Sequence, residues 1–94
     1  MHTSLAIAAQ LVGPATAVSE IIARAERIDR LEKTLNGMDP VDREVIALRH
    51  FEELSNIETA QVLKIETAAA SKRYIRAMAR LSKLLSEFAE SESE

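Results

Sequence analysis

The chain has 94 residues, enough for one small domain at most, and 47% of them are hydrophobic, which is too many for a disordered polymer. Two glycines and two prolines are too few for the turns of a small β-sandwich or barrel, and the absence of cysteine excludes disulfides and thiolate metal sites. The net charge of −3 indicates no class of partner by itself. We therefore predict an all-α domain, and a cytoplasmic one because no apolar run approaches the ~20 residues that span a bilayer.

Residues 1–18 are mostly small and apolar, show no usable hydrophobic period and are interrupted by Gly13-Pro14. We predict a linker there, disordered or only partly ordered by packing. The first helix is predicted over residues 19–36, because apolar side chains recur at three- and four-residue steps while basic side chains occupy the opposite positions. Asn36-Gly37 then predicts that this helix ends with a residue in the left-handed backbone conformation.

The second and third helices are predicted from their first residues. Asp39 can cap a helix over residues 40–53, and Pro40 loses no needed N–H at the first helical position. Ser55-Asn56-Ile57-Glu58 fits a capping box at the start of a short helix over residues 55–63. Both helix starts are therefore specified by local signals.

A long fourth helix is predicted after the turn Lys64-Ile65-Glu66. Apolar side chains at steps of three and four predict it over residues 67–88, and an acidic tail follows over residues 90–94. A short capped helix, a tight turn and a second helix make a helix-turn-helix, so we predict that motif at residues 55–81. The predicted fold over residues 19–89 is a small four-helix bundle that contains a winged-helix-like three-helical core. The predicted core consists of Leu31, Leu35, Val45, Leu48, Leu54, Ala60, Leu63, Ile65, Ala70, Tyr74, Ala77 and Leu81.

The weak net charge conceals a segregated distribution. The net charge is −4 over residues 1–63, +5 over residues 64–83 and −4 over residues 84–94. A strongly basic block is a candidate contact with a polyanion, although a solvated helix face carries the same pattern.

The basic block coincides with the second helix of the predicted helix-turn-helix. In such motifs the first turns of that helix point at base edges in the major groove, while cations further along it reach phosphates. We therefore predict a DNA-binding surface formed by Lys64, Thr67, Ala68, Ala69, Ser71, Lys72, Arg73 and Arg76. A competing role for Arg73 is an ion pair with an acidic neighbour such as Glu58.

The middle of the chain carries a series of short motifs at fixed intervals. They are Met38-Asp39-Pro40, DREVIALRHF at 42–51, ELS at 53–55, ETA at 58–60, VLKI at 62–65, SKRYIRA at 71–77 and RL at 80–81. In these motifs residues 34–85 resemble domain four, the C-terminal DNA-binding domain, of bacterial sigma factors of the sigma-70 family, especially the extracytoplasmic-function group. The sequence departs from that pattern at Glu66, at Ala70 and at Lys64, which stands where these proteins usually have a turn glycine. A positive φ at Lys64 carries a modest strain.

The resemblance implies recognition of the promoter −35 element by the basic helix. It also implies that the helices before it dock on the flap of the β subunit of core RNA polymerase, and we expect Ile46 and Phe51 to be exposed there. An anti-sigma factor is a further candidate partner. Sigma factors have another domain, N-terminal to this one, that nothing here resembles, so we expect a fragment in which residues 1–30 hold the linker and the first helix.

Two other functions fit a small helical domain. The first is a helical module that binds polymerase or an anti-sigma factor without touching DNA, but such a module has no need of a net charge of +5 on one helix. The second is the helix-turn-helix domain of a transcriptional activator of the response-regulator type, but such domains have no counterpart of the long segment that residues 19–35 form here.

His2 and His50 have no ligands at metal spacing, and we find no phosphate loop or catalytic set, so we predict no enzyme, no metal and no cofactor.

Overall fold

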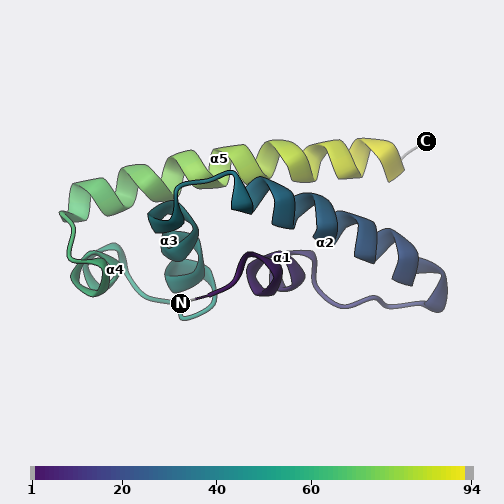
Figure 1. Ribbon diagram of the computed structural model, residues 1–94, viewed down its shortest axis with the longest axis horizontal. Helices are drawn as coiled ribbons and strands as arrows, with labels where there is room; N and C mark the ends of the chain where they lie inside the picture. Colours follow the sequence, from purple (N-terminus) through teal and green to yellow (C-terminus); the bar gives the residue numbers. More distant parts are fainter. Residues whose placement is uncertain (1, 93–94) are drawn as a thin grey trace.

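The computed structural model describes residues 2–92, and the all-α prediction is confirmed (Figure 1). Its elements are α1 (Ser4–Val12), the 3₁₀ helix η1 (Val18–Glu20), α2 (Ile21–Asn36), α3 (Pro40–His50), α4 (Asn56–Leu63) and α5 (Thr67–Glu92). The described residues contain no strand, and none of their helices is long and apolar enough to cross a membrane. The last two residues of the predicted acidic tail, 93 and 94, lie outside the described residues.

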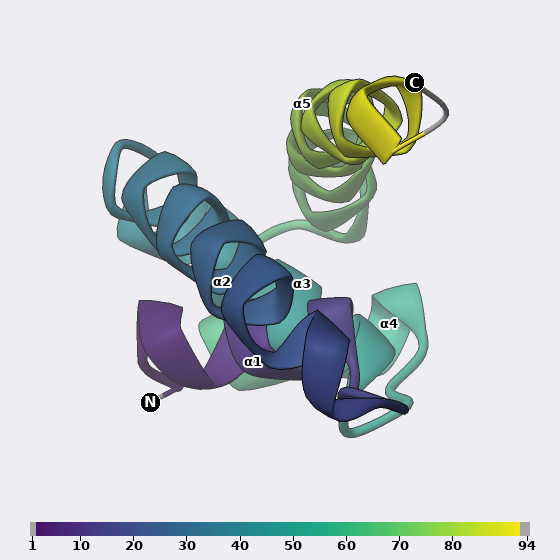
Figure 2. The same cartoon turned by 90° about the vertical axis from the view of Figure 1, so that its right-hand side faces the viewer.

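The long helix α5 runs along one side of the molecule, which measures 44 × 20 × 20 Å (Figure 1). It packs on α3 and α4 at its N-terminal end and on α2 further along, while α1 packs mainly on α2. Figure 2 views the molecule end-on and shows every other helix on one side of α5. The opposite side of α5 is therefore left uncovered.

Helix α1 occupies part of the segment that we predicted to be a linker. Thr3 caps it, since its side-chain oxygen accepts a hydrogen bond from the amide of Ala6 at 3.1 Å. Ile7 and Ala8 are fully buried in the main core. The prediction missed this helix because nearly all its residues are small or apolar, so no polar face marked a 3.6-residue period. The domain therefore has five α-helices in the described residues rather than four.

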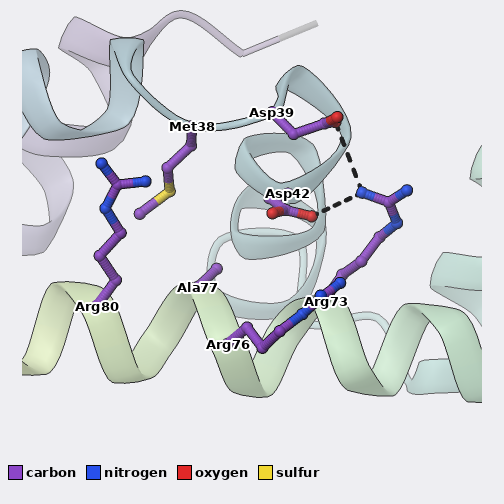
Figure 3. Close-up of a pocket in the computed structure, with 7 residues that line it drawn as sticks. All are labelled: Met38, Asp39, Asp42, Arg73, Arg76, Ala77 and Arg80. Carbon is purple, nitrogen blue, oxygen red and sulfur yellow. Dashed lines mark hydrogen bonds and ion pairs between the residues drawn. The ribbon is translucent and has the colours of Figure 1, made fainter.

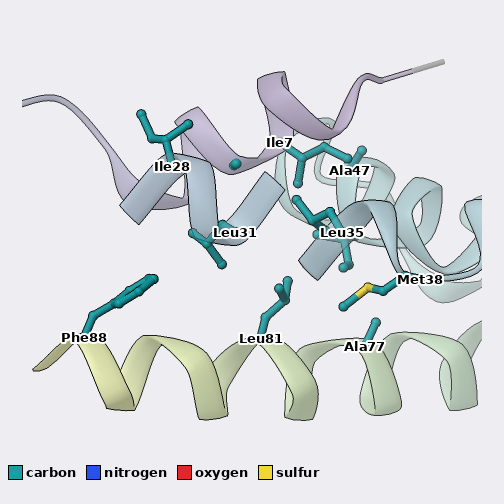
Figure 4. Packing of buried hydrophobic residues seen from close by; sticks show 11 residues of the cluster. Ile7, Ile28, Leu31, Leu35, Met38, Ala47, Ala77, Leu81 and Phe88 are labelled. Atoms are coloured by element: carbon teal, nitrogen blue, oxygen red, sulfur yellow. The ribbon is translucent and has the colours of Figure 1, made fainter. Parts of the chain in front are cut away.

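The main core lies between α2 and α5 and is closed by α1 (Figure 4). Leu31 and Leu35 of α2 lie between Ile7 on one side and Leu81 and Phe88 of α5 on the other. Eight of the twelve predicted core residues are buried: Leu31, Leu35, Val45, Leu48, Ala60, Ala70, Ala77 and Leu81. The other four are only half-buried: Leu54, Leu63, Ile65 and Tyr74. Leu54, Leu63 and Ile65 lie in or beside α4, and Tyr74 lies in the first half of α5.

The capping predictions are confirmed. The Asp39 carboxylate accepts a hydrogen bond from the amide of Val41 at 2.8 Å, and Pro40 begins α3. At α4 the capping box is complete, since the Ser55 amide donates to the Glu58 carboxylate at 3.0 Å and the Glu58 amide donates to the Ser55 hydroxyl at 3.1 Å. The Ser55 amide lowers the pKa of Glu58, so this contribution to stability is lost as the pH falls through the lowered pKa.

Helix α2 ends at Asn36 as predicted, but the conformation predicted at this end is wrong, and so is the predicted end of the next helix. Gly37 has φ −81°, not a left-handed conformation, because its amide bonds back to Lys33 and Thr34 and the amide of the buried Met38 bonds to Leu35 in a tight right-handed turn. Helix α3 ends at His50 rather than residue 53, because Glu53 adopts a positive φ of 55° and turns the chain toward α4.

Ala60 of α4 is buried, as the sequence predicted. Replacing Ala60 with Leu overpacks this site and should lower the free energy of unfolding by about 1–3 kcal/mol, measured by urea denaturation. The control is Gln61→Leu on the exposed side of the same helix, which should change stability by less than about 0.5 kcal/mol. Equal midpoints for the two variants would contradict the placement of Ala60.

Candidate nucleic-acid interface

Helices α4 and α5 are joined by a tight turn at Lys64. This residue adopts a left-handed conformation, with φ 57° and ψ 45°, and its amide bonds back to carbonyls of Ala60 and Gln61. The next amide, that of Ile65, donates to the carbonyl of Ala60 at 3.0 Å. These bonds close the end of α4 and let α5 begin after two more residues, which is the helix-turn-helix geometry. A lysine therefore holds the conformation that a glycine holds more easily.

The predicted DNA-binding residues are divided between exposed and half-buried positions. Exposed are Lys64, Thr67, Ala68, Lys72 and Arg76, whereas Ala69, Ser71 and Arg73 are half-buried. On a helix of 3.6 residues per turn, Ala68 and Lys72 lie opposite the buried stripe formed by Ala70, Ala77 and Leu81. They therefore belong to the side of α5 that no other helix covers (Figure 2).

The prediction missed one residue of this uncovered side. Ile75 is 63% exposed, and helical geometry places it beside Ala68 on the outward surface, on the side away from Lys72. We define the outward face of α5 as Ala68, Lys72, Ile75 and Arg76. The sequence contained the signal, because Ile75 falls two residues before the buried Ala77 and hence on the opposite side of the helix.

Three cations, in the turn before α5 and on its first turns, have no acidic partner among the described residues. Within residues 2–92, Lys64, Lys72 and Arg76 form no ion pair, and α5 has no acidic residue before Glu87. A set of unpaired cations on one uncovered helix generates a positive potential at the surface and favours a polyanion.

Arg73 is the exception among the basic side chains at the start of α5. Its guanidinium lies 2.8 Å from the Asp42 carboxylate and 3.6 Å from that of Asp39, both at the start of α3 (Figure 3). The hydrogen bond to Asp42 raises the pKa of Arg73. The proposed partner Glu58 is wrong, because its carboxylate is held in the capping box. Arg73 therefore ties α5 to α3.

The ion pair borders a groove of about 350 Å³ between α3 and α5 (Figure 3). The groove is lined by Met38, Asp39, Asp42, Arg73, Arg76, Ala77 and Arg80. Both carboxylates are directed at Arg73, and within the described residues no group of three or more acidic or histidine side chains could hold a metal ion. The groove is thus a junction between α3 and α5.

A second junction fixes the other flank of α5. The Arg49 guanidinium lies 4.4 Å from the centre of the Tyr74 ring and donates a hydrogen bond to the Asn56 side chain. The Tyr74 hydroxyl lies 2.9 Å from Nε2 of His50. Because Arg49 and His50 end α3 and Asn56 begins α4, these contacts hold three helices in one orientation.

The two residues expected on a polymerase-docking face are not both exposed. Ile46 is fully buried, so the prediction of an exposed Ile46 is wrong. It belongs to the main core with Leu35, Met38 and Ala77, because α2 and α5 cover that side of α3. Phe51 is half-buried against the same core.

The comparison with protein families decides the family. Residues 28–81 match the family described as Sigma-70, region 4, which is more than half of the chain and includes α3, α4 and the first half of α5. The chain belongs to this family. Comparisons with curated proteins and with solved structures gave no match.

The left-handed turn makes a prediction about this region 4 domain. Replacing Lys64 with Gly removes the strain of a side chain at positive φ and should raise the free energy of unfolding by up to about 1 kcal/mol, measured by urea denaturation. The matched control, Lys72→Gly in the middle of α5, should lower it by about 1 kcal/mol. Equal losses at both positions would contradict a strained turn.

Proposed function

We propose that this protein is the −35-recognition domain of a sigma factor of the extracytoplasmic-function type, and that the first half of α5 enters the major groove of promoter DNA. The observation that carries the proposal is the outward face of α5, which joins small, apolar and cationic side chains on a helix with no acidic residue from Thr67 to Ser86. Membership of the region 4 family supports the same conclusion.

The residues of the outward face of α5, together with Ser71 and Lys64 beside it, suit different parts of the duplex. Ala68 and Ser71 are small and let the helix backbone approach the bases, while Lys72 projects from the second turn, where side chains reach base edges. Ile75 offers an apolar contact of the kind that reads the methyl group of thymine. Arg76 and Lys64 lie to either side and reach phosphates.

Arg73 has a different role in this proposal. Its guanidinium is already held by Asp42 and Asp39, so contact with a phosphate would require breaking two ion pairs. We assign Arg73 to positioning α5 on α3, and through that to the angle at which the outward face meets the groove.

Core RNA polymerase is the second proposed partner, bound through the β-flap by the side of the domain formed by α2 and α3, and an anti-sigma factor is a candidate competitor. A cytoplasmic location follows from these partners.

A helical module that binds only proteins would gain nothing from unpaired cations on α5, so that alternative is less consistent with the surface. The helix-turn-helix domain of an activator remains the second candidate, and the family match disfavours it.

The phosphate contacts predict how binding depends on salt. Replacing Arg76 with Ala should weaken binding of the chain to all duplexes alike and lower the slope of log affinity against log salt by ~1, because one fewer counterion is released. The measurement is fluorescence anisotropy over a salt series. The control is Lys33→Ala, an exposed cation of α2 paired with Asp29 at 2.8 Å, which should leave the slope unchanged. Identical slopes for all three proteins would show that α5 is only a solvated face.

The base contacts predict a change of preference instead of a uniform loss. Replacing Lys72 or Ile75 with Ala should alter the bases selected from a random pool of duplexes, with a lost bidentate contact worth ~1–3 kcal/mol at one position. Arg76→Ala should select the same sequence as the unaltered chain. If Lys72→Ala and Ile75→Ala also select an unchanged sequence, the outward face of α5 does not read bases.

A further inference from the structure

Helix α1 packs on α2 and also meets α3 in the main core (Figures 1 and 4). Ile7 and Ala8 contribute its fully buried face, and they belong to one cluster with Leu35 of α2 and Ala47 of α3. Phe51 packs against the edge of this cluster. Without α1, a strip of apolar surface on α2 and α3 would face solvent.

Polar contacts fasten the start of α1 to α3. The Ser4 hydroxyl accepts a hydrogen bond from Arg43 at 2.8 Å. The His2 amide donates to the Glu44 carboxylate at 3.2 Å, and its ring lies 3.1 Å from the other oxygen of Glu44, 3.6 Å from Glu52 and 6.4 Å from the ring of Phe51. Glu44 therefore faces the N-terminal end of α1, where the positive end of a helix dipole favours a carboxylate.

The attachment of α1 is separable from the helix-turn-helix. The helix has nine residues, fewer than the ~12–15 that an isolated helix needs to persist in water, so its helical state depends on docking. The connection to η1 is not helical and begins with Gly13, at φ 79°, followed by Pro14. Both junctions that orient α5, at Arg73 and at Tyr74, are made with α3 and α4 and do not involve α1.

We propose that α1 is an intramolecular cover, and that a short apolar helix of core RNA polymerase displaces it to dock on the strip of α2 and α3 that includes Ala47 and Phe51. This inference rests on the proposed polymerase contact. The chemistry of the partner is given by the helix now in place, since α1 has no charged residue, buries Ile7 and Ala8 and packs Ala9, Leu11 and Val12 against the edge of the core. Glu44 fixes the direction of the incoming helix by favouring its N-terminus.

The exchange of one helix for another leaves no charged side chain buried without a partner. When α1 leaves, Glu44 becomes hydrated, and Arg43 keeps its second hydrogen bond, to the Asn36 side chain at 3.3 Å. The apolar strip is exposed only between the departure of α1 and the arrival of the partner. The apparent affinity for polymerase therefore equals the affinity of the uncovered domain multiplied by the fraction of molecules from which α1 is released.

Hydrogen exchange of the full chain, measured by mass spectrometry with and without core RNA polymerase, tests the displacement directly. We expect amides of α1 to lose protection in the complex while amides of α2 and α3 keep or gain it. A complex in which α1 stays protected would overturn the cover while leaving the polymerase contact intact. Failure of the chain to bind polymerase at all would overturn the polymerase contact and this inference with it.

A pair of variants tests the predicted gain in affinity. Ala8→Glu places a charge at a fully buried position and should release α1, while Leu5→Glu makes the same charge change on the exposed side of the same helix. If α1 is released in about one molecule in ten of the unaltered chain, Ala8→Glu should bind core polymerase about tenfold more tightly. Leu5→Glu should bind like the unaltered chain, and both should bind duplex DNA equally. Equal or weaker polymerase binding by Ala8→Glu would overturn the proposal.

Discussion

The structure depends on α5 having two different sides. One side is buried against the other helices along its length, and the opposite side is left uncovered. The inner side of α5 is buried along its length, since Ala70 is fully buried near the end that packs on α3 and α4, and Ala77, Leu81 and Phe88 belong to one cluster with Leu31 and Leu35 of α2 (Figure 4). The alanines matter because a larger side chain would push α5 away from α3 and separate Arg73 from Asp42. A single continuous helix therefore belongs to the apolar core at the α2 end of the domain and carries the basic surface at the other end.

Orientation of that surface depends on polar contacts more than on apolar burial. Around the turn, Leu63 and Ile65 are only half-buried, so the apolar contacts there are modest. On either side of α5 the chain instead places a charged or aromatic contact, Arg73 with Asp42 on one flank and Tyr74 with Arg49 and His50 on the other. Partly exposed ion pairs add little to stability, but they select one angle between two helices from several that packing alone allows.

What the sequence predicted correctly was local. The caps at Asp39 and Ser55 and the all-α class follow from neighbouring residues, and the strained turn at Lys64 follows from a family pattern. The errors at Gly37 and at the end of α3 were local, whereas the other errors concerned tertiary packing. Helix α1 has no polar face of its own to mark its period, Ile46 is buried only because α2 and α5 meet over it, and the partner of Arg73 lies 31 positions away in the chain. The DNA-contact and polymerase-contact residues stay predictions.

The position of α1 has a consequence for how the two proposed partners act together. In the end-on view α1 lies on the far side of the domain from α5, and the contacts that orient the start of α5, at Arg73 and Tyr74, do not involve α1 (Figure 2). Release of α1 therefore leaves in place the polar contacts that orient the outward face of α5. Two sites influence each other only when both bias the same structural equilibrium. Covering and uncovering the α2 and α3 strip would thus tune the affinity for polymerase while the choice of DNA sequence stays constant, which separates how often a promoter is used from which promoter is read.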